Sequence, residues 1–377
     1  METKQEHSIS GSPVISLKKR MTYDHAGRLI KSEEQLNKTD WITVNELKYN
    51  EKGELISKKL YSADGTNFLQ EVNYDYNIRG WMTFINNPEN LGTDFFAVQL
   101  KYENGQTPQY NGNISETIWA DSAFTEQKGY TFTYDGINRL TTANYTDAQK
   151  YNTAYQYDFN GNILTLNRNG QTDELTNLYG NIDNLSYAYS GNQLLKVDDT
   201  EISENQENGF TDNGSFEDIE YLYDVNGNMI KDFNKDIDSV SYNHLNLPER
   251  IEVSGNGSLN IIYYTYDAAG IKLNKYADYS NGYDKTTDYV GNFIYENDQL
   301  KYILNDYGKI IVDSITPDAF FTRQYNLTDH LGNVRVTFNV KSDSTADIVQ
   351  EDSYYPFGMT MNGLNYLTAN DQIDKNK

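Results

Sequence analysis

Hydrophobic and polar residues alternate along short stretches of this chain, and the stretches end in turn-forming residues. In one such stretch Tyr155, Tyr157 and Phe159 occupy alternate positions, so an extended strand would present the three rings on one face. Asn160-Gly161 follows, a pair that favours positive φ at both residues and therefore a tight hairpin turn. The residues after this turn fit a strand that returns antiparallel. The pattern predicts a β-hairpin.

One phrase underlies most of the predicted hairpins: a tyrosine, usually with an aspartate beside it, a glycine a few residues later, and then an aliphatic residue. The four clear copies contain Tyr23, Asp24 and Gly27; Tyr157, Asp158 and Gly161; Tyr223, Asp224 and Gly227; and Tyr266, Asp267 and Gly270. Looser copies begin at Tyr49, Tyr76, Tyr102, Tyr134, Tyr189 and Tyr242. Their spacing, mostly about 20 to 30 residues, is the length of one supersecondary unit and indicates a repeat architecture. No segment carries sustained helical periodicity, so the chain is expected to be all-β.

Each residue type in the phrase has a structural explanation. The glycines permit the turns, and the aspartates are turn residues. We expect the rings of Tyr157, Tyr223 and Tyr266 to stack between neighbouring hairpins. The 33 tyrosines and a mean hydropathy of −0.75 fit strands that are half buried and half wet, because tyrosine joins a β-favouring ring to a polar tip. An exposed aromatic surface that stacks sugars is the alternative interpretation of the same rings.

The repeat divides the chain into four expected regions. Residues 1–20 are polar and are expected to form an irregular leader, and residues 21–277 carry the hairpin repeat. Residues 278–365 form a further β region, and residues 366–377 are expected to be a frayed tail. Two distinctive phrases lie in the third region. The first contains Asp329, His330, Gly332, Asn333 and Arg335, and the second contains Tyr355, Pro356 and Gly358.

Candidate catalytic and metal-binding residues are scarce. The four histidines lack the spacing of a zinc site, and His330 is better explained as a ring that closes a turn beside Gly332. The Asp158-x-Asn160-Gly161 sequence differs from a calcium loop, which places glycine at its sixth position and glutamate at its twelfth. Adjacent acids such as Asp198-Asp199 arise by chance among 55 acidic residues. We therefore expect no enzymatic activity, no cofactor and no metal site.

Charge and composition narrow the range of partners. The chain holds 31 Lys plus Arg against 55 Asp plus Glu, a net charge of −24, so a nucleic-acid backbone would repel it. It contains no cysteine and no apolar run of the roughly 20 residues that a membrane-spanning helix needs. Nucleic acid and a membrane span are therefore not expected. The unpaired edges of an open hairpin strip would favour self-association.

The Tyr-Asp units resemble the YD repeats of Rhs proteins, and residues 329–335 with 352–358 resemble the Rhs repeat-associated core segment. The resemblance extends from Met21 to about Asn365. The repeat sequences resemble those of Rhs proteins from Bacteroidetes-type bacteria. It implies a strip of β-hairpins that spirals into a hollow shell around a toxic C-terminal domain, as in the C subunits of insecticidal toxin complexes. The Asp-Pro-x-Gly-Leu signature of aspartyl self-cleavage and a cargo domain are absent from this sequence. The chain thus resembles a partial member that would form an open section of a shell.

The resemblance implies a structural function. The chain would encapsulate cargo in an Rhs-type toxin system that serves competition between bacteria, and its partners would be the remainder of the shell and the enclosed toxin. It would be secreted or held at the cell surface, although residues 1–20 contain no signal peptide. Two alternatives remain. One is an extracellular adhesion or carbohydrate-binding module with a glycan ligand, and the other is a fragment of a self-processing aspartyl protease shell.

Overall fold

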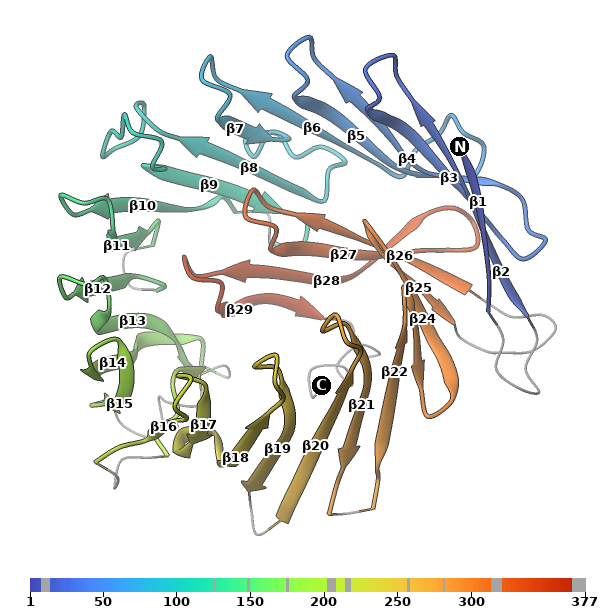
Figure 1. Ribbon diagram of the computed structural model, residues 1–377. Helices are drawn as coiled ribbons and strands as arrows, with labels where there is room; N and C mark the ends of the chain where they lie inside the picture. The colour runs from blue at the N-terminus through green and yellow to red at the C-terminus, as the bar shows by residue number, and fades with distance from the viewer. Residues whose placement is uncertain are drawn as a thin grey trace. The chain divides into compact units, whose positions relative to one another are not determined.

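The computed structural model describes residues 1–7, 14–124, 126–147, 150–173, 176–201, 208–213, 218–255, 258–280, 282–312 and 321–367 (Figure 1). Almost all regular structure in these residues is β-strand, and consecutive strands pair in sequence order, from β1 to β15 in one sheet and from β16 to β29 in another. The strand pairs described, such as β12 with β13, are antiparallel. The expected all-β fold of successive hairpins is confirmed.

The chain divides into two compact units, which we call unit 1 and unit 2. Unit 1 contains Met1–Thr133 and Asn305–Lys377, so it joins the two ends of the sequence, and unit 2 contains Tyr134–Leu304. The strands of unit 1 are β1 (Glu2–His7), β2 (Ile15–Tyr23), β3 (Leu29–Leu36), β4 (Ile42–Tyr49), β5 (Leu55–Ser62), β6 (Gln70–Tyr76), β7 (Met82–Ile85), β8 (Phe96–Lys101), β9 (Glu116–Asp121), β10 (Lys128–Tyr134), β25 (Gly308–Val312), β26 (Phe321–Thr328), β27 (Val334–Val340), β28 (Ala346–Tyr354) and β29 (Thr360–Leu367).

Unit 2 continues the same hairpin pattern. Its elements are β11 (Leu140–Tyr145), β12 (Thr153–Tyr157), β13 (Ile163–Asp173), β14 (Leu178–Ser190), β15 (Gln193–Asp199), β16 (Tyr221–Tyr223), β17 (Met229–Asp232), the short 3-10 helix η2 (Phe233–Lys235), β18 (Ile237–Tyr242), β19 (Pro248–Gly255), β20 (Ser258–Tyr266), β21 (Lys272–Asp278), β22 (Lys285–Val290), β23 (Phe293–Glu296) and β24 (Gln299–Asn305). None of the described helical structure is long and apolar enough to cross a membrane.

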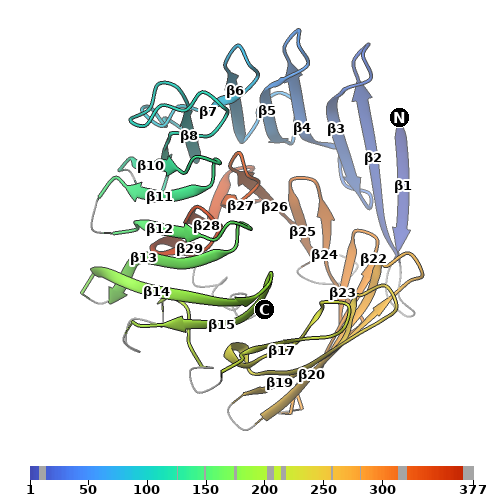
Figure 2. The ribbon, with the colours of Figure 1, turned by 60° about the vertical axis from the view of Figure 1, so that its left-hand side comes forward.

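Unit 1 has two layers. Strands β25 to β29 lie against the early strands of the chain, as both views show (Figures 1 and 2). Large rings fill the space between the layers: Tyr325 meets Tyr61 edge-on at 6.2 Å between ring centroids, and Phe338 meets Phe95 edge-on at 5.4 Å. Trp119, from β9, is 1% exposed. Burial of these rings stabilises this unit.

Unit 2 has a core made by adjacent hairpins. Tyr155, Leu166, Leu185, Val197 and Tyr221 form one buried cluster, and they come from successive strands between β12 and β16. Along β12, buried and exposed positions alternate, as the sequence pattern predicts for a strand with one covered face. The later strand β19 contains no fully buried residue.

The turns between hairpin strands differ in detail from the expectation. Gly161 has a φ of 94°, but Asn160 is not among the residues with positive φ, so the expected pair of positive-φ residues is wrong for Asn160. The turn spans Asp158 to Gly161, with the glycine in the left-handed region and a register shift where Tyr157 faces Ile163. This is a four-residue turn that ends in a glycine bulge. Phe159 sits in this turn and is fully exposed, so it does not share the buried face of Tyr155.

The ends of the chain also differ from the expectation. An irregular leader is wrong for residues 2–7 and 15–20, because β1 pairs with β2 and Glu2 lies opposite Arg20. The side chains of β1 are polar on both faces, so hydrophobic alternation could not indicate this strand. At the other end β29 extends to Leu367, and residues 368–377 of the expected tail lie outside the described residues.

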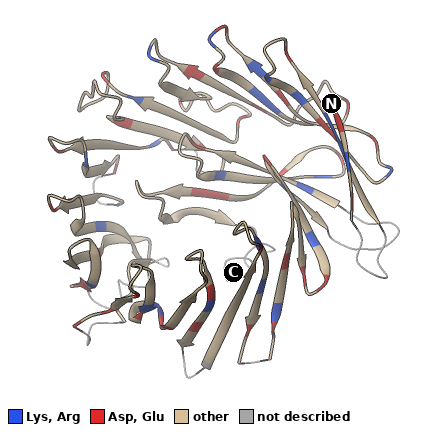
Figure 3. Ribbon diagram, in the orientation of Figure 1, with Lys and Arg blue, Asp and Glu red and all other residues tan. Residues whose placement is uncertain are grey.

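Charged residues are dispersed along the strands of both units. Figure 3 shows basic and acidic positions interspersed, and many of them are close pairs, such as Lys101 with Glu116 at 2.9 Å. Such pairs on partly exposed strands contribute roughly 1 kcal/mol or less each.

Candidate functional site

Nine of the described turns are each held by one side chain that accepts two backbone hydrogen bonds. In the turn after β12, Asp158 Oδ1 accepts from the backbone N–H groups of Asn160 and Asn162, at 2.8 Å each. Asp158 N–H also donates to Asn162 O, which closes the turn. The same two contacts are made by Asp24, Asn50, Asn77, Asp135, Asp224, Asn243, Asp267 and Asp329. The expected role of these residues as turn formers accounts for their contacts.

These bonds favour the charged form of Asp24 and Asp224. The backbone hydrogen bond from Arg28 is the largest cause that lowers the pKa of Asp24, and the side chain of Asn228 is the largest that lowers the pKa of Asp224. A carboxylate that accepts several hydrogen bonds is a poor proton carrier near neutral pH. The repeated aspartates are therefore suited to structure and not to acid-base catalysis.

The fourth turn position needs a residue that tolerates positive φ. Gly27, Gly161, Gly227 and Gly270 take φ values between 80° and 94° there. In two looser repeats asparagine replaces the glycine: Asn138 has a φ of 69° and Asn246 a φ of 57°. Asparagine is among the few residues with a side chain that adopt this conformation readily. This substitution explains why the sequence phrase is incomplete at Tyr134 and Tyr242.

In eight hairpins a tyrosine links the hairpin to the one before it. Its hydroxyl donates to a backbone carbonyl of the preceding hairpin: Tyr157 to Leu140 at 2.7 Å, Tyr189 to Ile163, Tyr223 to Leu194, Tyr242 to Met229, Tyr266 to Pro248, Tyr76 to Leu55, Tyr102 to Met82 and Tyr354 to Val334. We call these eight contacts the tyrosine ties. Tyr23, in the first repeat, instead donates to Met21 Sδ within its own strand. The hydroxyl bonds, and not only the rings, link the repeats.

Ring contacts of the same tyrosines run along the strands. Tyr157 stacks on Tyr155 at 6.5 Å, and Tyr266 packs on Tyr264 at 6.4 Å, each pair within one strand. Arginine adds a link between hairpins: Arg139 binds Asp135 and Asp158 O, and its guanidinium lies 4.7 Å from the centre of the Tyr157 ring. The repeat is thus held by hydrogen bonds, ring packing and cation–π contacts between nearest neighbours.

The two distinctive phrases of the third region form neighbouring turns in unit 1. The first lies between β26 and β27, and the second lies between β28 and β29. Asp329 Oδ2 accepts from Arg335 Nε at 3.0 Å, and Arg335 Nη1 reaches Asp352 O. In the second turn Tyr355 occupies the aspartate position, since Gly358 N–H donates to Tyr355 O. Tyr354 makes the tyrosine tie there, and because an aspartate does not follow it, the repeat phrase does not indicate this role.

The placement of the remaining residues in these phrases is structural. His330 lies in the first turn, where burial is the largest cause that lowers its pKa, and its Nδ1 is buried without a hydrogen-bond partner. Gly332 and Gly358 both have a φ of 87°. Asn333 Nδ2 donates to Asp329 Oδ2. Pro356 is the residue after Tyr355 in the second turn.

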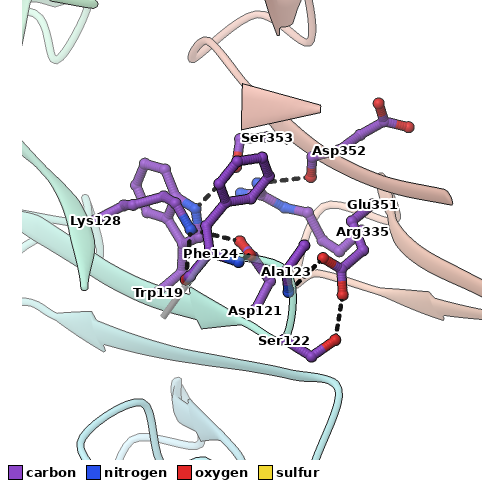
Figure 4. A network of polar contacts seen from close by, with 10 residues as sticks. All are labelled: Trp119, Asp121, Ser122, Ala123, Phe124, Lys128, Arg335, Glu351, Asp352 and Ser353. Atoms are coloured by element: carbon purple, nitrogen blue, oxygen red, sulfur yellow. Dashed lines mark hydrogen bonds and ion pairs between the residues drawn. The ribbon is translucent and has the colours of Figure 1, made fainter. Parts of the chain in front are cut away.

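A buried polar network joins the two layers of unit 1 beside these turns (Figure 4). We call its four charged residues, Asp121, Lys128, Arg335 and Glu351, the interlayer cluster. Lys128 Nζ lies 2.7 Å from Asp121 Oδ2, and Glu351 Oε2 accepts from Ala123 N–H at 2.7 Å. These four residues are each 8% exposed or less.

Aromatic rings surround the cation nearest the C-terminal turns. The Arg335 guanidinium lies 5.5 Å from the ring centre of Phe96 and 5.3 Å from those of Trp119 and Tyr354. Trp119 Nε1 donates to Ser353 Oγ at 3.1 Å, which pins the indole to β28. Cation–π contacts at desolvated sites contribute about 2 kcal/mol. Arg335 is thereby fixed by an ion pair, a carbonyl and three rings.

Burial shifts the pKa values of Glu351 and Lys128, in the interlayer cluster, in opposite directions. Loss of water raises the pKa of Glu351, and the negative charge of Asp121 raises it further. Burial also lowers the pKa of Lys128, while Asp121 acts against this shift. Perturbed groups of this kind occur in active sites, and also in structural ion-pair networks. Here Asp121 pairs with Lys128 within one layer, and Glu351 binds Ser122 and Ala123 of the other layer, which fits a structural role.

The described residues contain no group of three or more His, Asp or Glu side chains arranged to hold a metal ion. Glu351 binds Ser122 and Ala123, which lie more than 200 positions away in the sequence, so no local motif could have indicated that it joins the pair of Asp121 and Lys128. Its single sequence signal is Arg335, which lies within the phrase already noted.

Comparisons with known proteins bear on the fold. The sequence matches no protein-family model and no curated protein. Over 95% of its length the chain is similar to part of the Tc holotoxin pore of Photorhabdus luminescens, solved with a mutation in TccC3, with a TM-score of 0.59 and 14% sequence identity. It is similar over 95% of its length to TcdB2-TccC3 without the hypervariable C-terminal region (TM-score 0.58, 13% identity), and over 93% to TcdB2-TccC3-TEV (TM-score 0.56, 14% identity).

In each of these comparisons the chain covers 18% of the larger protein. At such low identity the likeness concerns the fold. The expected Tc-toxin-like arrangement of antiparallel hairpins is confirmed, and it covers nearly the whole chain.

Proposed function

We propose that this chain is a wall segment of an Rhs-type toxin shell. The observation that carries the proposal is the run of tyrosine ties, because they join each hairpin to the preceding one by bonds that any number of further hairpins could continue. The similarity of fold to TcdB2-TccC3 chains over nearly all of this chain supports it. Its partners would be further shell segments and an enclosed toxic polypeptide.

The proposed activity is encapsulation without catalysis. The acids in the repeat turns bind backbone, Asp121 binds Lys128, and Glu351 binds Ala123 of the other layer, so their geometry favours stability over turnover. The setting would be competition between bacteria, and the chain would act outside the cell or at its surface. Purified protein incubated for hours at pH 5 to 8 should keep its full mass, whereas fragments that appear with time would indicate self-processing.

Protection of a neighbouring polypeptide tests encapsulation directly. The polypeptides encoded on either side of this chain would be produced together with it and digested with trypsin. We expect one of them to copurify and to resist cleavage until denaturant unfolds the hairpins. Equal cleavage rates with and without this chain would contradict the proposal. A growth assay against neighbouring bacteria would then test the role in competition.

A further inference from the structure

Lys58 in β5 is a half-buried lysine that faces two tyrosine rings. Its Nζ lies 5.9 Å from the ring centre of Tyr74, on β6, and 5.8 Å from that of Tyr307, in the turn between β24 and β25. Tyr74 and Tyr307 come from the two sequence segments that make up unit 1. Each of the three side chains is only partly buried, so solvent can reach the group.

The ammonium group of Lys58 has no carboxylate partner among the described residues. Burial is the sole cause that lowers its pKa, and no acidic side chain acts against that shift. Lys101 and Lys128, which are also partly or fully buried, lie within 3 Å of Glu116 and Asp121. A cation removed from water without an anion is costly, and cation–π contacts return only about 0.5 to 2 kcal/mol. Lys58 thus lacks the carboxylate partner that Lys101 and Lys128 have.

Each of the two tyrosines carries a phenol hydroxyl, and the phenols lie near enough for the charge of Tyr307 to act on Tyr74. The Tyr307 hydroxyl accepts from Asn45 Nδ2, which leaves its own proton for an acceptor. The Tyr74 hydroxyl makes no described hydrogen bond. Burial raises the pKa of Tyr307 to about 12 and that of Tyr74 well above its usual range, so both phenols stay protonated near neutral pH. One ammonium and two hydroxyl groups are therefore available to a single acceptor.

Neighbouring acids do not fill this position. Asp306 acts on Tyr307, and Glu54 acts on Tyr76, but neither acts on Lys58. Across the strands Lys58 faces Leu47 and Val72, which are apolar. The site thus has one formal positive charge in a setting without a counter-ion.

We propose that Lys58, Tyr74 and Tyr307 form a binding site for one carboxylate group. A single negative charge matches the single ammonium, and the two carboxylate oxygens can accept from the ammonium and from a phenol together. The carboxylate could belong to a small organic acid or to a polypeptide, and the chemistry of recognition is the same for both.

Binding of two probes tests this site and separates the two sources. Sodium acetate, and a short peptide with a free C-terminal carboxylate, would be titrated into the protein by calorimetry at constant ionic strength set with chloride. The amidated form of the peptide serves as a control. We expect saturable binding of at least one free carboxylate and none of the amide. Binding of acetate alone would indicate a small acid, and tighter binding of the peptide would indicate a polypeptide.

Three variants locate the binding. Lys58→Met removes the charge and should weaken binding at least tenfold. Tyr307→Phe keeps the ring, removes one donor and should weaken binding several-fold, and it carries the test where Lys58→Met fails to fold. Lys59→Met is the matched control, because Lys59 neighbours Lys58 and lies 5.5 Å from the Phe68 ring instead. Absence of saturable binding by the unmodified protein, or equal binding by Lys58→Met, would overturn the proposal.

Discussion

The two units use the same hairpins but are held together over very different sequence distances. In unit 1 the Trp119–Ser353 hydrogen bond spans 234 residues, and the Arg323–Glu34 pair spans 289. In unit 2 the longest described side-chain hydrogen bond, from Asn208 to Gln171, spans 37. Unit 1 is closed by contacts between distant strands, whereas unit 2 is held by contacts between neighbouring hairpins.

This difference predicts how cooperatively each unit unfolds. A repeat that is stabilised by nearest neighbours can open locally, and its stability is approximately a sum over adjacent units. In a two-layer core, the loss of a contact between the layers destabilises both layers. The same hairpin can therefore be a local or a global element, depending on whether a second layer covers it.

Removal of Trp119 should have the largest effect on this comparison. Trp119→Ala deletes a ring that is 1% exposed, together with its bond to Ser353, and should destabilise unit 1 by about 3–5 kcal/mol. Hydrogen exchange should show loss of protection in both β9 and β28, with unit 2 unchanged. Trp41→Ala, at a partly exposed ring over Arg20, is the control and should cost far less. Equal losses in the two units would contradict the two-layer account.

Glu34 should be the next most sensitive position. Its carboxylate lies 2.7 Å from Arg323 Nη1 and 3.3 Å from Lys19 Nζ, and it is 3% exposed. Glu34→Gln leaves Arg323 without a charged partner and should cost about 3 kcal/mol in urea unfolding.

The adjacent residue gives a matched control for the Glu34 variant. Glu33 pairs with Lys31 and Arg20 at a more exposed position, so Glu33→Gln should change stability by less than about 1 kcal/mol. Similar losses of stability in Glu33→Gln and Glu34→Gln would show that the Glu34–Arg323 contact between the layers contributes no more than an exposed ion pair.

Gly161→Val tests the local character of unit 2. A Cβ at this position would meet nothing within 4 Å, so the cost comes from the φ of 94° and should be about 2 kcal/mol. Exchange should accelerate in β12 and β13 and not in distant hairpins. Gly136 lies in a comparable turn, and a Cβ there would also meet nothing within 4 Å. Its φ is not positive, so Gly136→Val should be nearly neutral. A parent-like melting temperature for Gly161→Val would show that the turn assignment is wrong.

Loss of a tyrosine tie should have a smaller effect. Tyr157→Phe, Tyr223→Phe and Tyr266→Phe each remove one hydroxyl bond to a backbone carbonyl and should cost about 1 kcal/mol. Tyr23→Phe is the control, because that hydroxyl reaches only Met21 Sδ at an exposed site. If all four variants melt alike, the ties do not link the hairpins.

The sequence predicts the hairpins and their turns, which are formed by residues close in the chain, but it does not predict the contacts between distant segments. Tyr157, Asp158 and Gly161 are close in the chain, and turn chemistry requires them at fixed spacing, so the hairpin could be inferred. The pairing of Glu34 with Arg323 could not, because no periodicity connects residues 289 positions apart. Strand β1 gives no hydrophobic signal in the sequence, because its residues are polar and exposed and it is held by backbone pairing and by charged contacts such as Glu2 with Arg20.

The last prediction concerns pH and Glu351. Its pKa is raised in the folded protein, mainly by burial, so its contribution to stability is present in acid and is lost as the pH rises through the folded pKa. Glu351→Gln cannot titrate. The stability of the variant relative to the parent should therefore increase with pH above the ordinary value of 4.5, by at most about 1.4 kcal/mol per pH unit. Urea unfolding between pH 4.5 and 7.5 measures this difference. Parallel curves for Glu351→Gln and the parent would mean that Glu351 does not couple the packing of the layers to pH.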